Sequence, residues 1–115
     1  MADTVAESLY RQMTSPGTTT LGVEGATLAS SASVSLAIDH YLHAVSGTAE
    51  QLLIDLPYTG FAGTIALRPT GNFTTNTTGV KTGLSKAIGL ASTAVTGKVL
   101  FMTYSPAADL WYPSY

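Results

Sequence analysis

Cysteine is absent from this 115-residue sequence, and charged residues are scarce. Without cysteine, neither a disulfide framework nor a thiolate metal site can form. Asp, Glu, Lys and Arg make up only 10% of the residues, whereas a typical domain contains about 25%. The five basic residues are scattered and the net charge is −2, which is unsuited to binding nucleic acid through its phosphates. We therefore expect no nucleic-acid partner.

Long apolar segments are missing as well. No run approaches the ~20 apolar residues that a membrane helix needs. The N-terminus has neither the basic start nor the apolar stretch of a signal peptide. We expect no membrane partner, and we expect the protein to act in the cytoplasm or in a particle assembled there.

Hydroxyl groups supply most of the polarity instead of ions. The chain contains 18 Thr and 11 Ser, while 45% of its residues are hydrophobic. This balance fits a surface largely covered by partners, or a β protein whose outward positions are Thr. The length fits one domain with one modest core.

The few charges are unevenly distributed along the chain. Residues 1–55 contain six acidic residues and one basic residue, a net charge of −5. Residues 56–115 contain four basic residues and one acidic residue, a net charge of +3. This asymmetry has two interpretations. An acidic face of one subunit could contact a basic face of another, or the asymmetry could be a chance result of the small number of charges.

Residues 1–16 are expected to form a short N-terminal helix or arm. Thr4 and Glu7 have the spacing of a capping box, and Ser15-Pro16-Gly17 ends the helix. So short a helix is marginal alone in water, so that its apolar face must dock, on its own domain or, as we favour, on a partner. The candidate contact residues of this face are Val5, Leu9 and Met13.

Residues 17–115 are expected to form a single β domain. Apolar residues alternate with polar ones, or form short runs, and Gly, Pro and Ser separate these stretches. The predicted strands are 34–38, 41–45, 52–56, 64–68 and 99–104. This pattern predicts an all-β fold, a small sandwich or a jelly-roll-like barrel.

Residues 80–91 are ambiguous. Val80, Leu84 and Ile88 have helical spacing, but Gly83 and Gly89 interrupt it at a cost of about 1 kcal/mol each relative to Ala. We interpret the segment as a loop followed by a short strand.

The segment from Asp39 to His43 has the most reactive composition in the chain. On a helix, His40 and His43 would share a face and could bind a metal ion. On the predicted strand they would point to opposite faces. We therefore expect no metal site, and the sequence indicates no cofactor.

No motif for catalysis is evident. The chain has no Gly-x-Ser-x-Gly sequence, since 83–87 lacks the second glycine. The glycine-bounded segment 71–79 contains no Lys to hold a phosphate. A pair of carboxylates across a cleft has little room in one short subunit. We predict that the protein is not an enzyme and has no catalytic residue.

Aromatic residues gather near the C-terminus, which holds five of the ten in the chain. Large rings with a polar tip are favoured both in cores and at interfaces. Trp111 is equally suited to either place, and a ring at the last position frays unless something holds it. The candidate interface residues here are Trp111, Tyr112 and Tyr115.

The second half of the chain, residues 60–115, contains five distinctive segments: 63–74, 88–92, 95–100, 103–104 and 111–115. These segments resemble a recurring ending of tailed-phage structural proteins. Similar endings occur in head decoration (cement) proteins, head fibres and tail-fibre or tailspike modules. The resemblance implies a β-rich trimer. It differs at 105–110, where the family often has a tighter turn before its Trp, so that the exact turn stays open while the strand pairing is expected.

Among virion parts, the length of the chain favours a capsid decoration protein over a tail fibre with its shaft and tip. We expect a homotrimer that binds the major capsid protein on the capsid exterior of a virion assembled in the host cytoplasm. It would stabilise the shell by bridging capsid subunits. One alternative is a receptor- or glycan-binding module of a tail fibre or tailspike, which exposed aromatics lining a groove would favour. The second is a small hydrolase at a subunit interface, which an Asp–His pair facing a cleft would favour.

Overall fold

The structure is a computed structural model that describes residues 23–114. The predicted arm, with Val5, Leu9 and Met13, and the terminal Tyr115 lie outside the described residues. The described part contains strands and no helix, which confirms the all-β prediction. The strands are β1 (Leu28–Ala29), β2 (Leu42–Ser46), β3 (Leu53–Asp55), β4 (Gly63–Pro69), β5 (Phe73–Thr75), β6 (Ser85–Ala87), β7 (Ser92–Ala94), β8 (Leu100–Ser105) and β9 (Leu110–Ser114).

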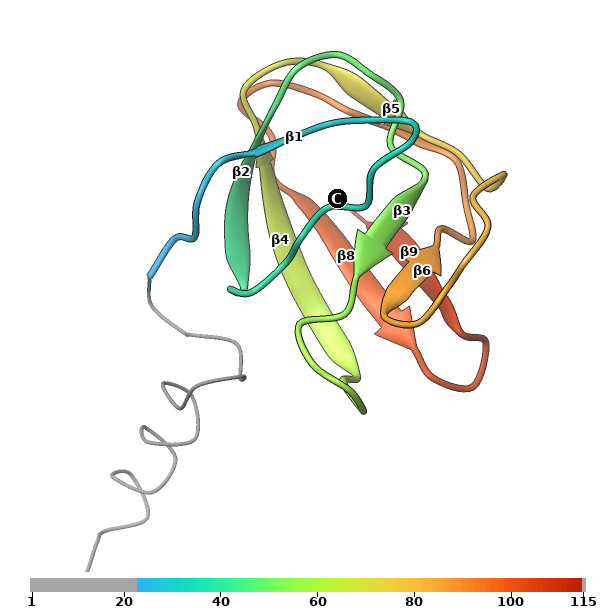
Figure 1. The fold of residues 1–115 in the computed structure, drawn as a ribbon. Helices are drawn as coiled ribbons and strands as arrows, with labels where there is room; N and C mark the ends of the chain where they lie inside the picture. Colours follow the sequence, from blue (N-terminus) through green and yellow to red (C-terminus); the bar gives the residue numbers. More distant parts are fainter. Residues whose placement is uncertain (1–22, 115) are drawn as a thin grey trace, which may run out of the picture.

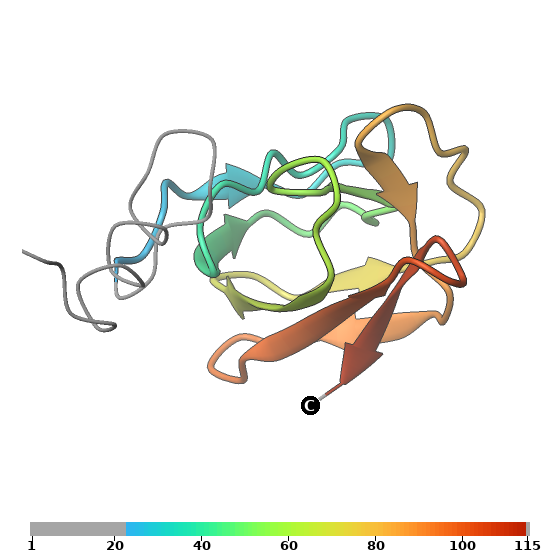
Figure 2. The same cartoon turned by 90° about the horizontal axis from the view of Figure 1, so that it is seen from below.

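A mixed five-stranded sheet forms one layer of the domain, in the order β1-β2-β4-β8-β9. β1, β2 and β4 pair in parallel, whereas β4, β8 and β9 pair antiparallel. The antiparallel ladders β3–β6 and β5–β7 are separate two-stranded sheets. The β3–β6 ladder lies on one side of β8 and β9 (Figure 1), and the turned view shows β6 and the β8–β9 hairpin in opposite layers (Figure 2).

The core lies between these layers. Along β8, Leu100, Met102 and Tyr104 are buried while Phe101 and Thr103 are exposed, the period-two pattern of a strand with one face on the core. Further core residues come from β2, β3, β4 and β5 and from the connections between strands; they include Leu36, Ile38, Val45, Ile54, Phe61, Ile65, Leu67 and Phe73. Each such side chain contributes about 1.5–3 kcal/mol when it is fully removed from water.

One fully buried polar side chain fastens the loop before β2 to the core. Gln51 Oε1 accepts a hydrogen bond from the Ser31 amide at 2.8 Å, and Nε2 donates to the carbonyl oxygens of Val34 at 2.9 Å and Leu53 at 2.7 Å. Because both amide hydrogens have acceptors, the cost of burying the group is offset.

Three of the predicted strands correspond closely to β2, β4 and β8, and 52–56 contains the shorter β3. The prediction for 34–38 is wrong as a full strand, because only Leu36 forms a bridge, with Ile54. Residues 80–84 form a loop before β6, as predicted, with Val80 and Leu84 exposed. No strand was predicted at β5 or β7, whose segments are rich in Thr and Ser. No helix among residues 23–114 is long and apolar enough to cross a membrane.

Candidate functional site

The side of the main sheet that faces away from the core is the candidate functional surface, which we call the open face. The burial patterns of β4, β8 and β9 alternate, so that every second side chain leaves the core. The open face consists of Thr64, Ala66, Arg68, Phe101, Thr103, Tyr112 and Ser114.

Two aromatic rings and a hydroxyl pair dominate the open face. Phe101 is 43% exposed and Tyr112 39% exposed, which is unusual for rings of their size. Thr64 and Thr103 lie opposite one another, with their Oγ1 atoms 2.7 Å apart. Arg68 is the one charged residue of this set, and its Nε donates to Glu24 Oε2 at 2.8 Å. The surface is therefore almost free of unpaired charge and is suited to close contact with another protein.

The backbone positions the ring of Tyr112. A Cβ atom added at Gly89 would lie 2.6 Å from Cε1 of Tyr112, so that the ring packs directly on the glycine backbone. The amide of Gly89 also donates to the carbonyl oxygen of Trp111 at 2.7 Å. Tyr112 is thus held at the surface, and its role as an interface residue stays a prediction.

The expectation that Trp111 contacts a partner is wrong. Its side chain is fully buried in its own domain, next to the rings of Phe61 and Tyr104 at centroid distances of 5.9 and 5.5 Å. Its Nε1 donates to the carbonyl oxygen of Ile54 at 2.9 Å. Trp111 and Tyr112 are neighbours on one strand, so that the period of two places one ring inside and the next outside.

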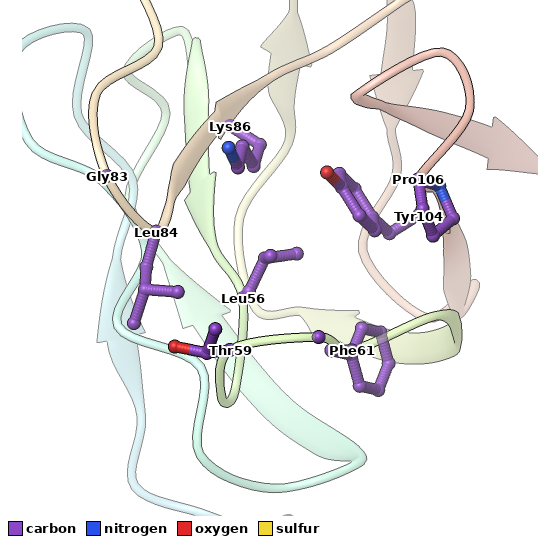
Figure 3. Close-up of a pocket in the computed structure, with 9 residues that line it drawn as sticks. Leu56, Thr59, Phe61, Gly83, Leu84, Lys86, Tyr104 and Pro106 are labelled. Carbon is purple, nitrogen blue, oxygen red and sulfur yellow. The ribbon is translucent and has the colours of Figure 1, made fainter.

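A cavity of about 250 Å³ opens between the two layers (Figure 3). Leu56 and Phe61 contribute apolar side chains, while Lys86 from β6 and Tyr104 from β8 contribute polar atoms. The other lining residues are Thr59, Gly60, Gly83, Leu84 and Pro106. None of the lining residues is a histidine or a carboxylate. The cavity can accommodate a small apolar group.

A charged cluster lies beside the cavity at the turn between β8 and β9. Asp109 adopts a positive φ of 57° and accepts a hydrogen bond of 2.5 Å from the Tyr104 hydroxyl. Lys81 and Lys86 lie 3.0 and 3.1 Å from its carboxylate oxygens. The hydrogen bond from Tyr104, followed by those from the lysines, holds the pKa of Asp109 well below its ordinary value. Burial, together with the hydrogen bond to Asp109, raises the pKa of Tyr104 to about 12.

These ion pairs bear on the uneven charge distribution along the chain. Of the four basic residues in the second half, Arg68 pairs with Glu24, and Lys81 and Lys86 pair with Asp109. The two carboxylates of Glu24 and Asp109 thus offset two of these four positive charges within the subunit.

The prediction that His40 and His43 point to opposite faces is wrong. The strand β2 begins only at Leu42, so that His40 precedes it and strand alternation does not relate the two side chains. Their rings meet edge to face at a centroid distance of 5.5 Å. Asp39 Oδ1 lies 2.6 Å from His40 Nδ1 and 3.1 Å from His43 Nε2. The geometric reason for expecting no metal site at this position therefore no longer holds.

The Asp39–His40 pair does not face the cavity, because neither residue lines it. The sequence identified the pair by composition but gave the wrong orientation. Comparison with protein-family models, with curated proteins and with solved structures found no match to this chain.

Proposed function

We propose that the protein is a decoration (cement) protein of a tailed-phage head, which binds the outer surface of the capsid as a homotrimer. The observation that carries the proposal is the open face: a nearly uncharged sheet surface with two half-exposed rings, Phe101 and Tyr112. Exposed rings at the centre of a polar surface are typical of protein contacts.

The resemblance to virion proteins supports this proposal through its location in the fold. The segments 63–74, 103–104 and 111–115 resemble those of virion parts and include β4 and portions of β8 and β9, three adjacent strands. These three strands also provide the open face. Three of the five segments that resemble virion parts thus lie in the strands with the surface best suited to assembly.

We assign the open face to contacts between copies of the chain and the N-terminal arm to the major capsid protein. A trimer presents three arms, so that weak individual contacts combine into stable attachment. Val5, Leu9 and Met13 would supply the apolar contacts to the capsid. The protein would reinforce the shell by bridging capsid subunits, without catalysis.

The arrangement of aromatic residues favours this role over a glycan-binding module. Stacking against a sugar ring needs exposed aromatic faces along a groove. The rings that line the cavity, Phe61 and Tyr104, are only 2% and 6% exposed. Phe101 and Tyr112 are exposed but lie on the open face, outside the cavity lining.

The test is to mix the untagged protein with filled heads that lack it and to count bound copies by quantitative mass spectrometry. We expect saturation at a copy number that is a multiple of three fixed by capsid symmetry. Replacing Val5, Leu9 and Met13 together by Ser should abolish head binding and leave the thermal midpoint nearly unchanged. The matched control replaces Glu7 and Arg11 by Ser.

Two results would contradict the proposal. Recovery of the protein with tails instead of heads would favour the receptor-binding alternative. Full head binding by the triple Ser variant would remove the arm from the contact.

A further inference from the structure

The residues Asp39, His40 and His43 form a cluster at the start of β2. One ligand atom from each residue lies within 4.8 Å of the others. The His43 ring is only 1% exposed, whereas the side chains of Asp39 and His40 are 71% and 23% exposed. One nitrogen ligand is therefore fixed in the core, while solvent reaches the cluster from the side of Asp39.

A backbone contact identifies the tautomer of neutral His43. Its Nδ1 lies 2.8 Å from the carbonyl oxygen of Ala26. A carbonyl oxygen can only accept a hydrogen bond, so Nδ1 carries the hydrogen and neutral His43 keeps a lone pair on Nε2. Metal-binding histidines are commonly oriented in this way, with the second ring nitrogen donating to a backbone carbonyl.

The lone pair of His43 faces another electron-rich atom. Nε2 and Asp39 Oδ1 are 3.1 Å apart, and with neutral His43 neither atom supplies a hydrogen to the other. The backbone amides of Asp39 and His40 both point at Nε2, each at 3.1 Å. Two amide dipoles thus share one lone pair, and a cation that binds there must displace them.

One of the separations between ligand atoms is close to that of a tetrahedral zinc site, and a second is shorter. Ligand atoms about 2.0 Å from zinc are about 3.3 Å apart in tetrahedral geometry. The His43 Nε2 to Asp39 Oδ1 separation of 3.1 Å is near this value. The His40 Nδ1 to Asp39 Oδ1 separation of 2.6 Å must widen, which requires movement of the partly exposed His40 and Asp39 side chains.

Gly25 packs against the rings of His40 and His43. A Cβ atom at this position would lie 2.3 Å from His43 Cε1 and 2.7 Å from His40 Nδ1. The Gly25 amide also donates to the carbonyl oxygen of Leu42 at 2.8 Å. The absence of a side chain at Gly25 therefore allows both rings to occupy their positions.

We propose that Asp39 Oδ1, His40 Nδ1 and His43 Nε2 bind one divalent transition-metal ion of the zinc type. Two imidazoles and one carboxylate are a donor set that such ions accept. The ion would hold the turn at Asp39 and His40 against His43 in β2. The inference stands on these three side chains and is independent of capsid binding.

The experiment uses untagged, chelator-treated full-length protein titrated with Zn²⁺ by calorimetry, and with Co²⁺ by visible absorption. We expect one ion per chain, a higher thermal midpoint with Zn²⁺, and a cobalt spectrum with nitrogen and oxygen ligation. Asp39→Asn and His40→Gln should each weaken binding by at least about tenfold. Because both side chains reach solvent, melting curves without metal should confirm that these variants fold.

Glu50→Gln is the matched control, because it removes a carboxylate elsewhere and should bind Zn²⁺ like the wild type. A wild-type protein that binds no stoichiometric Zn²⁺ or Co²⁺ at micromolar concentration would overturn the proposal. Unchanged affinity in both Asp39→Asn and His40→Gln would overturn it as well, since the bound ion would then lie elsewhere.

Discussion

At the scale of single residues, Trp111 joins the two layers of the domain. The residue belongs to β9 of the main sheet, and its indole nitrogen donates to Ile54 in β3 of the opposite layer. The rings of Phe61 and Tyr104 pack beside it. One side chain therefore contributes apolar burial, ring contacts and a hydrogen bond across the core.

Trp111→Phe should lower the free energy of unfolding by about 2 to 3 kcal/mol, because the smaller ring leaves a gap and the hydrogen bond to Ile54 is lost. The measurement is chemical denaturation at equilibrium. Tyr112→Phe, the neighbouring residue with its ring at the surface, is the control and should change the value by no more than about 0.5 kcal/mol. Equal effects at the two positions would contradict the assignment of inner and outer rings.

At the scale of elements, the β8–β9 hairpin depends on the residue that ends its turn. The left-handed backbone conformation of Asp109 is one that Asp and Asn tolerate better than most residues. Its amide donates to the carbonyl oxygen of Ser105 at 2.7 Å, while its carboxylate accepts from the Tyr104 hydroxyl. The turn is thus fixed by both the backbone and the side chain of one residue.

The lowered pKa of Asp109 predicts acid sensitivity. A carboxyl group whose pKa is lower in the folded state stabilises the fold above the ordinary value of 3.8, and this stabilisation is lost as the pH falls below it. Thermal midpoints should therefore decrease below about pH 4. Asp109→Asn keeps the backbone preference but removes the charge that pairs with Lys81 and Lys86. It should therefore lower the thermal midpoint at neutral pH and make its decrease in acid shallower.

Tyr104→Phe separates the contribution of the Tyr104 hydrogen bond to the lowered pKa of Asp109 from that of the two lysines. The variant removes the largest cause of the lowered pKa but retains the carboxylate and both lysines. We expect acid unfolding of this variant to occur at higher pH than acid unfolding of the wild type. An acid transition that is identical in wild type, Asp109→Asn and Tyr104→Phe would show that the cluster does not contribute to acid stability.

At the scale of the whole molecule, the open face predicts the oligomeric state. Sedimentation of the wild type at micromolar concentration should give the mass of a trimer. Replacing Phe101 and Tyr112 together by Ser should yield a folded monomer, because both rings are already partly exposed in the single subunit. Val80→Ser, at a loop position that is 79% exposed, is the control and should remain trimeric. A wild-type monomer would contradict the trimer in solution.

The sequence was sufficient to predict the all-β class and the strands at 41–45, 64–68 and 99–104, but alternation at 34–38 wrongly predicted a full strand. In 64–68 and 99–104 the buried positions follow the period of two, and both segments are central strands. β5 and β7 were missed because they are short and four of their six residues are Thr or Ser, which are also common in polar loops. The contacts of Gln51 with Ser31, Val34 and Leu53 had no local signal, since they depend on tertiary structure.

The candidate sites were harder to predict than the fold. Alternation could not relate His40 to His43, because it holds only within a strand and β2 begins between them. For Trp111, composition gave two equal interpretations, and only the register of β9 against β8 decides which ring faces inward. Both errors concern where a strand begins or which face is buried, which depends on the neighbouring strands.

Pro113 limits how copies of this protein can add to one another. It lies in β9, which is an edge strand of the main sheet, and proline has no N–H to donate to an approaching strand. The carbonyl oxygen of Trp111 on the same strand already accepts the Gly89 amide. Extension of the sheet from chain to chain is thereby disfavoured along this edge. Strand-by-strand addition of copies, which would give open-ended fibrils, is therefore opposed at β9.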